Sequence, residues 1–171
     1  PVQQPTEASG RFRAALIALR QTAQNRPIWG VAAFLFLWSF NPFSSAVLYL
    51  HWTDHLKLGE QYYGYSVSLL SIGAIAGSLM YGVYSRFVSR GLLIHLSIIS
   101  GILATLAYGW ATDVTSASII SVIVGFCYMT GSMVQFDLAA RSCQIATAGT
   151  TFALLMSLSN LSMALSTGIG G

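Results

Sequence analysis

WSFNPFSS, residues 38–45, interrupts an apolar run of membrane-spanning length close to its middle. Proline has no backbone N–H and its ring clashes with the preceding helical turn, while hydrocarbon offers the freed carbonyl no water. Neighbouring protein or a wet cavity must therefore satisfy that carbonyl. We expect Pro42 to kink this helix, and we expect Asn41 and Pro42 to face other helices.

The composition is that of a membrane protein. Of the 171 residues, 54% are hydrophobic and only 8% are charged, whereas about a quarter of the residues in a typical soluble domain are charged. The formal net charge is +3, but the basic residues lie between apolar runs and do not alternate with aromatic residues as in a nucleic-acid-binding face. The sequence therefore predicts an all-α, polytopic bundle of membrane helices in a lipid bilayer, with no nucleic-acid partner.

Short polar segments divide the chain into a lead-in, residues 1–26, and a five-span transmembrane bundle, residues 27–171. Between Arg11 and Asn25, apolar and arginine side chains recur at helical spacing. This basic amphipathic helix either binds lipid on the cytoplasmic face of the membrane or is a solvated linker to the first span. The predicted spans are residues 28–52, 63–84, 92–110, 116–136 and 151–169.

Lysine and arginine residues in the short loops set the predicted orientation. Seven arginines precede the first span or follow the second and fourth spans, against Lys57 alone in the loops on the other side. Short loops rich in these residues stay in the cytoplasm, so we expect an integral, multi-pass protein with a cytoplasmic N-terminus. The seven residues are Arg11, Arg13, Arg20, Arg26, Arg86, Arg90 and Arg141.

The second predicted span carries two glycines four residues apart, Gly73 and Gly77. Small residues at this spacing allow the backbone of another helix to approach closely. We therefore predict a tight helix–helix contact at these glycines, in preference to contact with a ligand.

The order of these features resembles the C-terminal half of a major facilitator superfamily transporter, spans seven to eleven. The shared features are a basic lead-in, a kinked first helix, a glycine-rich second helix and a tight basic turn. Within that superfamily, several segments are similar to the folate-biopterin transporter family, and the similarity covers roughly residues 27 to 165. These segments are FLW (36–38) with Pro42 and Tyr49, YG (63–64), GVYSRF (82–87), AAR (139–141) and FALLMSLSNL (152–161).

This resemblance implies a secondary active transporter that moves a small organic solute, such as a folate or a pterin. Such proteins rock one six-helix half against the other around a site at the middle of the membrane. On that basis the chain is a fragment that lacks an N-terminal half and one further helix. The competing hypothesis is a self-contained five-span structural or partner subunit without transport activity.

The turn after the second span departs from the superfamily pattern. Many facilitators have an acidic residue directly before the arginine of this turn, whereas Ser85 precedes Arg86 here. Arg86 and Arg90 therefore act at a cytoplasmic gate, bind anionic lipid, or only determine the topology of the loop.

Polar side chains deep within apolar spans are the candidate substrate-binding residues. Asn41 lies near the centre of the first span and Asn160 near the centre of the fifth, where each amide must find a partner inside the bundle. Each residue either contacts the transported solute or makes an interhelical hydrogen bond that fixes the packing.

Gln135, Asp137 and Arg141 lie at the cytoplasmic end of the fourth span. Asp137 and Arg141 are four residues apart and share a helix face, so an ion pair within the helix is one interpretation. In the other interpretation, Asp137 exchanges a coupling proton while Gln135 and Arg141 bind an anionic solute, as the resemblance allows for folates.

No catalytic or metal-binding pattern accompanies these residues. His51 and His55 are four residues apart, but they lie at the expected outer boundary of the first span, where interfacial histidines are commoner than metal sites. The sequence has no serine–histidine–acid spacing, no phosphate-binding glycine loop and no cluster of metal ligands. We therefore expect no enzymatic activity, no cofactor and no metal.

Overall fold

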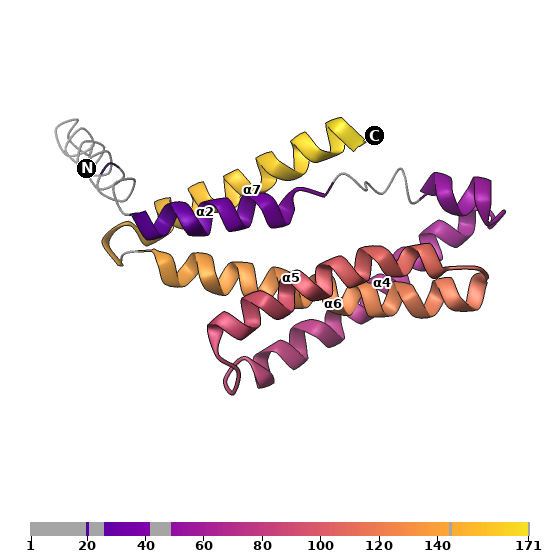
Figure 1. The fold of residues 1–171 in the computed structure, drawn as a ribbon, viewed down its shortest axis with the longest axis horizontal. Helices are drawn as coiled ribbons and strands as arrows, with labels where there is room; N and C mark the ends of the chain where they lie inside the picture. The colour runs from indigo at the N-terminus through magenta and orange to yellow at the C-terminus, as the bar shows by residue number, and fades with distance from the viewer. Residues whose placement is uncertain (1–19, 21–25, 42–48, 144, 171) are drawn as a thin grey trace, which may run out of the picture. The chain divides into compact units, whose positions relative to one another are not determined.

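The computed structural model describes residue 20 and residues 26–41, 49–143 and 145–170 (Figure 1). These residues form helices and the turns between them, with no β-strand among them, which confirms the predicted all-α class. The elements in chain order are α2 (Arg26–Ser39), the π-helix η1 (His51–His55), α4 (Glu60–Tyr84), α5 (Arg90–Ala107), the 3-10 helix η2 (Tyr108–Trp110), α6 (Val114–Ser142), the 3-10 helix η3 (Ile145–Thr147) and α7 (Ala148–Gly170).

Within the described ranges, four helical stretches are long and apolar enough to cross a membrane. They correspond to the second, third, fourth and fifth predicted spans. The stretches are Gln61–Tyr84, Arg90–Trp110, Val114–Ser142 and Ala148–Gly170.

Helix α6 continues to Ser142, beyond the predicted end of the fourth span at Phe136. The added turns contain leucine and alanine, which have high helix propensity, and Arg141, whose charge is favourable near a helix C-terminus. Asp137 and Arg141 therefore both lie on regular helix.

Helix α2 ends at Ser39, shortly before the proline of the opening segment. Pro42 has no N–H to donate to the carbonyl of Trp38, and it disfavours helical backbone at Asn41. These properties of proline account for the end of α2 just ahead of it.

Two sequence predictions fall partly outside the described residues. The predicted kink at Pro42 lies in residues 42–48, which are outside them, so the first predicted span is described only as α2 and as the helical residues 49–55. The lead-in helix predicted between Arg11 and Asn25 is outside them except for Arg20.

The chain divides into two compact units, which are described separately. The first unit, Pro1–Asn41 with Asp137–Ile169, contains α2, the last turns of α6, and α7. The second unit, Pro42–Phe136 with Gly170–Gly171, contains η1, α4, α5, η2 and most of α6.

In the first unit, the core joins α2, the end of α6 and α7. The buried side chains of α2 are Ile28, Ala32 and Leu35, which recur at helical spacing on one face. Ala32 and Leu35 pack with Ala139 and Leu155, and Leu35 has no exposed surface. One face of α2 therefore packs against protein, and the other faces of this helix do not contribute to the core of the first unit.

In the second unit, α4 and α6 approach each other backbone to backbone at glycines. A Cβ atom added to Gly73 would lie 2.0 Å from the Val122 carbonyl oxygen, and one added to Gly77 would lie 2.6 Å from the Phe126 carbonyl oxygen. Gly125 of α6 makes the reciprocal contact, because its Cβ would lie 2.0 Å from the Leu70 carbonyl oxygen. The predicted tight contact at Gly73 and Gly77 is confirmed.

An aromatic cluster also joins elements of the second unit. Trp52 of η1 is buried, and its ring centroid lies 5.5 Å from that of Tyr62, 6.4 Å from that of Tyr63 and 6.0 Å from that of Tyr108. The Tyr62 hydroxyl also donates a hydrogen bond to the Val114 carbonyl at 3.1 Å. These contacts connect η1 with the starts of α4 and α6 and with η2.

Helix α6 begins with a side-chain cap. The Ser116 N–H donates to the Asp113 carboxylate at 3.1 Å, and the Asp113 N–H donates to the Ser116 hydroxyl oxygen at 3.1 Å. Hydrogen bonding from the Ser116 side chain and then from its backbone lowers the pKa of Asp113 below its ordinary value. The charged form of Asp113 is thus favoured, and a negative charge is stabilising at a helix N-terminus.

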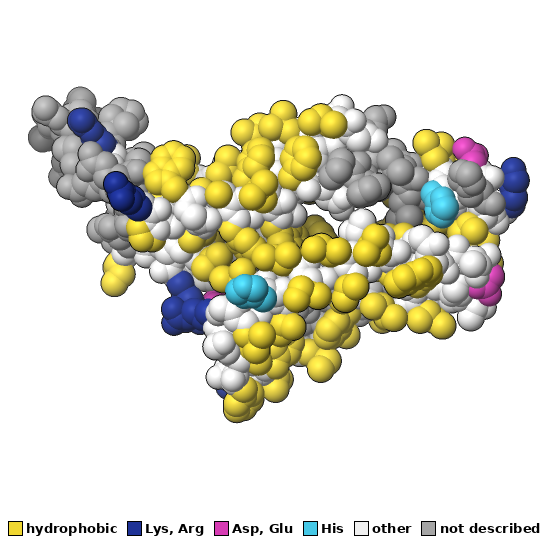
Figure 2. All heavy atoms as spheres, in the orientation of Figure 1, with side chains coloured by type: hydrophobic (Ala, Val, Ile, Leu, Met, Phe, Trp, Pro, Cys, Tyr) yellow, Lys and Arg dark blue, Asp and Glu magenta, His cyan; other side chains and the backbone are white. Residues whose placement is uncertain are grey.

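Large apolar side chains are exposed along the helices (Figure 2). Ile72 and Leu79 on α4 and Ile102 on α5 are 59%, 70% and 56% exposed. Such exposure is unfavourable in water, whereas lipid tails are as apolar as these side chains. Together with the four membrane-length helices, this surface indicates an integral, multi-pass membrane protein.

Candidate functional site

Two hydrogen bonds join the middle of α7 to the end of α2 in the first unit. The hydroxyl oxygens of Ser39 and Ser159 lie 2.5 Å apart. The Ser162 hydroxyl donates to the Phe36 carbonyl, also at 2.5 Å, and the Ser162 side chain is fully buried. Polar side chains thus hold together two apolar helices at this level.

These serines were not among the predicted site residues. Most serines of the described chain donate to a carbonyl one turn earlier in their own helix, as Ser157 does to Ala153, so serine in an apolar helix is a weak indicator of a site. A stronger signal was present, because Ser159, Ser162 and Ser166 are three and four residues apart and lie on one face of α7.

Asn41 and Asn160 are close to this polar contact along the sequence. Asn41 follows Ser39 by two residues and lies beyond the end of α2, and Asn160 directly follows Ser159 on α7. Both side chains are exposed at the surface of the first unit, whereas the serine contact itself is partly buried.

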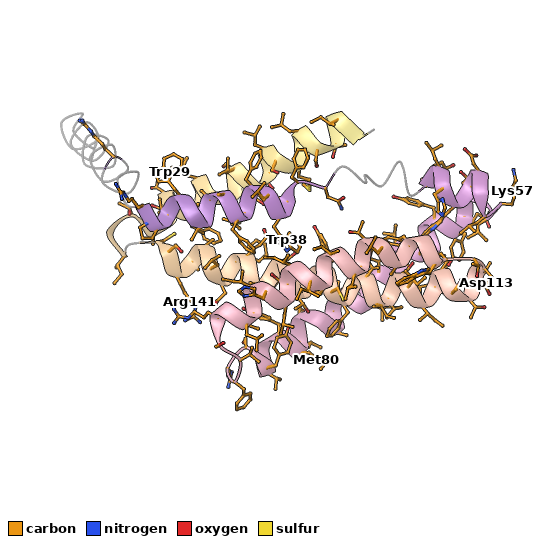
Figure 3. The ribbon with its side chains drawn as sticks, in the orientation of Figure 1. Trp29, Trp38, Lys57, Met80, Asp113 and Arg141 are labelled. Carbon is orange, nitrogen blue, oxygen red and sulfur yellow. The ribbon has the colours of Figure 1, made fainter. Side chains whose placement is uncertain are left out.

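Asp137 and Arg141 form an ion pair near the end of α6, where Arg141 is labelled in Figure 3. The Arg141 Nε atom lies 2.6 Å from the Asp137 Oδ1 atom, and the side chains are 53% and 31% exposed respectively. This confirms that the two side chains share a helix face. Solvent screening at such exposure keeps the pair weak as a stabilising contact.

Gln135 is placed differently from this pair. Its side chain is only 5% exposed, and residues two apart on a helix point to different sides. The three residues that the sequence groups at the end of the fourth span are therefore not gathered on one face of α6.

Arg86 and Arg90 lie in and after the turn between α4 and α5 in the second unit, and both are exposed. The turn is closed by the N–H groups of Phe87 and Val88, which donate to the Tyr84 carbonyl at 3.0 and 3.1 Å. Neither arginine has an ion-pair partner among the described residues.

The histidines are separate from these clusters. His51 begins η1, and the His95 Nδ1 atom lies 2.6 Å from the Gly91 carbonyl of its own helix α5. In the part of the chain that the structure describes, no three histidine, cysteine, aspartate or glutamate side chains are grouped in a way that would hold a metal ion.

Comparison with known proteins gives one family. The Major Facilitator Superfamily matches residues 1–167 of the chain. No curated protein and no solved structure matches. The matched range covers nearly the whole chain, including all four membrane-length helices except the last residues of α7. The chain therefore belongs to the Major Facilitator Superfamily of membrane transporters.

Proposed function

We propose that this chain is part of a secondary active transporter that moves a small organic solute by alternating access. Membership of the Major Facilitator Superfamily supports a transporter rather than an enzyme. Secondary transporters bind their solutes near the middle of the bilayer, at polar groups set within apolar helices.

The polar contact between α2 and α7 is the observation that carries this proposal. Ser159 and Asn160 lie at the middle of α7, which spans Ala148–Gly170, and the Ser39 hydroxyl lies within hydrogen-bonding distance of Ser159. Each serine hydroxyl can both donate and accept, and each asparagine amide offers two donors and an acceptor. Asn41 and Asn160 are the proposed solute contacts at this level.

Most of the remaining predicted residues take supporting roles in the proposal. Pro42 is the hinge of the first helix, and Arg86 and Arg90 act at the cytoplasmic gate. In this proposal Arg141 contacts an anionic part of the solute and Asp137 carries the coupling proton. The ion pair supports this last role, because a proton on Asp137 would weaken its bond to Arg141, whose guanidinium can bind a carboxylate of the solute. Gln135, which is buried on another side of α6, is not part of that contact.

Folate or pterin as the solute rests on the similarity of residues 36–38, 63–64, 82–87 and 152–161 to the folate-biopterin transporter family. The chemistry of the proposed contacts is compatible with it. A pterin ring presents amide-like donors and acceptors, which asparagine can match, and the glutamate part of folate carries carboxylates, which arginine binds in pairs of hydrogen bonds.

Uptake by proteoliposomes tests the proposal. The full-length protein that carries this chain should accumulate labelled folate or a pterin, and Asn160→Ala should lower the uptake rate at least tenfold because the solute loses a directed hydrogen bond at the middle of the membrane. Ser157→Ala is the matched control, since its hydroxyl bonds only to its own helix. Accumulation of an unrelated metabolite instead would contradict the proposed solute, and no uptake of any solute would favour the structural-subunit hypothesis.

The coupling role of Asp137 predicts a specific pH dependence. Wild-type uptake should fall as the external pH rises, and Asp137→Asn should remove that dependence because an amide exchanges no proton. Arg141→Gln should keep the pH dependence and raise the KM for an anionic solute. Asp113→Asn, which changes an exposed carboxylate at the start of α6, is the control. An unchanged pH profile in Asp137→Asn would contradict the coupling role.

A further inference from the structure

An apolar groove lies on the first unit between α2 and α7. It is lined by Trp29, Ala32, Ala33, Phe36, Leu37 and Leu158 and has a volume of about 350 Å³. The lining combines two small side chains, Ala32 and Ala33, with four larger apolar side chains. Trp29, which projects from α2 in Figure 3, is 62% exposed, and Leu37 is 71% exposed.

The lining determines what this groove accepts. Apart from the indole N–H of Trp29, its side chains carry no polar group, so a polar solute would lose hydrogen bonds to water or headgroups on entering it. A hydrocarbon chain would lose none and would gain dispersion contacts with the walls. The volume lies at the lower end of the range for small-molecule sites, which suits a narrow, flexible occupant.

Arg26, the first residue of α2, precedes the groove residues on that helix. Arg26, Trp29, Ala33 and Leu37 are spaced three, four and four residues apart, so they form a single stripe along α2. Arg26 is exposed and has no ion-pair partner among the residues that the structure describes. Its guanidinium can bind a phosphate through two parallel hydrogen bonds.

The sequence before α2 is also basic. Arg11, Arg13, Arg20 and Arg26 precede the first apolar run, and four or more basic residues beside a membrane helix favour anionic lipid headgroups. Trp29 follows Arg26 by one helical turn, and tryptophan at that depth typically lies at the level of the headgroups. The stripe on α2 thus has a basic residue that can bind a phosphate, followed by apolar residues that can contact an acyl chain. The phosphate and the acyl chains follow each other in the same order in a phospholipid.

We infer that the α2–α7 groove binds one acyl chain of an anionic phospholipid whose phosphate pairs with Arg26. A neutral hydrocarbon would make no ion pair with Arg26, and a free anion would make no contacts with the apolar side chains of the groove. The inference requires only that the protein lies in a membrane, so it stands whether or not the transported solute is a folate.

Native mass spectrometry of the full-length protein in detergent tests this inference. The protein is titrated with phosphatidylglycerol, with phosphatidylcholine of the same acyl chains, and with soluble glycerol phosphate. Phosphatidylglycerol should bind about fivefold more tightly than phosphatidylcholine, from the usual attraction of one basic residue for anionic lipid. Glycerol phosphate should bind far more weakly than either lipid, because it has no acyl chain.

Two variants separate the phosphate contact from the acyl contact. Arg26→Gln should remove the preference for phosphatidylglycerol and leave phosphatidylcholine binding unchanged, while Arg26→Lys should retain part of the preference. Ala33→Leu, which enlarges a small side chain of the lining, should weaken the binding of both lipids. Lys57→Gln and Ala164→Leu are the controls, because they remove a basic side chain and enlarge an alanine at exposed positions outside the groove.

Three results would overturn the inference. Equal binding of the two lipids by the wild-type protein would show that the phosphate is not recognised. Unchanged lipid binding in Ala33→Leu would show that the groove holds something else, such as a further helix of the protein. Glycerol phosphate bound as tightly as phosphatidylglycerol would show that only an anion site exists. Size-exclusion profiles matching the wild type establish that each variant is folded.

Discussion

Gly125→Ala is expected to lower the stability of the protein by about 3 kcal/mol, at the upper end of the cost of overpacking a core. The added methyl group would lie 2.0 Å from the Leu70 carbonyl oxygen and 2.9 Å from the Leu70 Cα atom, whereas ordinary contact begins at 3.4 Å. Both obstacles are backbone atoms, so no side-chain rotation relieves the clash. The helices α4 and α6 must separate, and every contact along their crossing weakens.

Gly73→Ala should have a similar effect, because its methyl group would meet the Val122 carbonyl oxygen at the same short distance. Gly82→Ala is the matched control on α4, since nothing lies within 4 Å of the position where its Cβ would be. Alanine there should be neutral or slightly stabilising, because it has the higher helix propensity. Thermal unfolding of the purified protein in detergent, followed by loss of the monodisperse peak, measures the difference. Equal melting temperatures for Gly73→Ala and Gly82→Ala would contradict the close contact.

The sequence predicts the helix–helix contact at Gly73, but it does not identify Gly125 of α6 as part of that contact. The Gly73–Gly77 spacing is a local pattern that can be recognised within one helix. Gly125 has a small residue four positions before it, Ser121, which is also buried, so the same pattern was present on α6. Hydropathy identifies the helices but does not show which helices are neighbours. The pairing of α4 with α6 is a property of the tertiary structure.

The candidate site shows the same division between local and tertiary information. Asn41 and Asn160 stand out in the sequence because amides are rare within apolar spans. The hydrogen bonds of Ser39 and Ser162 depend on α2 lying beside α7, which no single-helix pattern reveals. The sequence also grouped Gln135 with Asp137 by proximity along the chain, whereas the helix places them on different sides.

Leu155→Ala is expected to destabilise the first unit by about 2 kcal/mol, near the lower end of the range for large-to-small substitutions in a core. The expected cost is lower than in a soluble protein for a physical reason. A side chain that leaves this core enters lipid, which is as apolar as leucine, so most of the transfer contribution is absent. What remains is the packing that Leu155 makes with Leu35, Ala32 and Ala139, and the cavity left when the side chain is removed.

Leu154→Ala provides the comparison, because Leu154 is the adjacent residue on α7 and is 54% exposed, against 5% for Leu155. Both substitutions remove the same atoms from the same helix, so their effects on helix propensity and on hydrophobicity cancel. Titration with a denaturing detergent should therefore show a lower unfolding midpoint for Leu155→Ala and a midpoint close to wild type for Leu154→Ala. A lower midpoint for Leu155→Ala alone reports the packing of that side chain, whereas equal midpoints would mean that Leu155 faces lipid and that α7 is rotated about its axis.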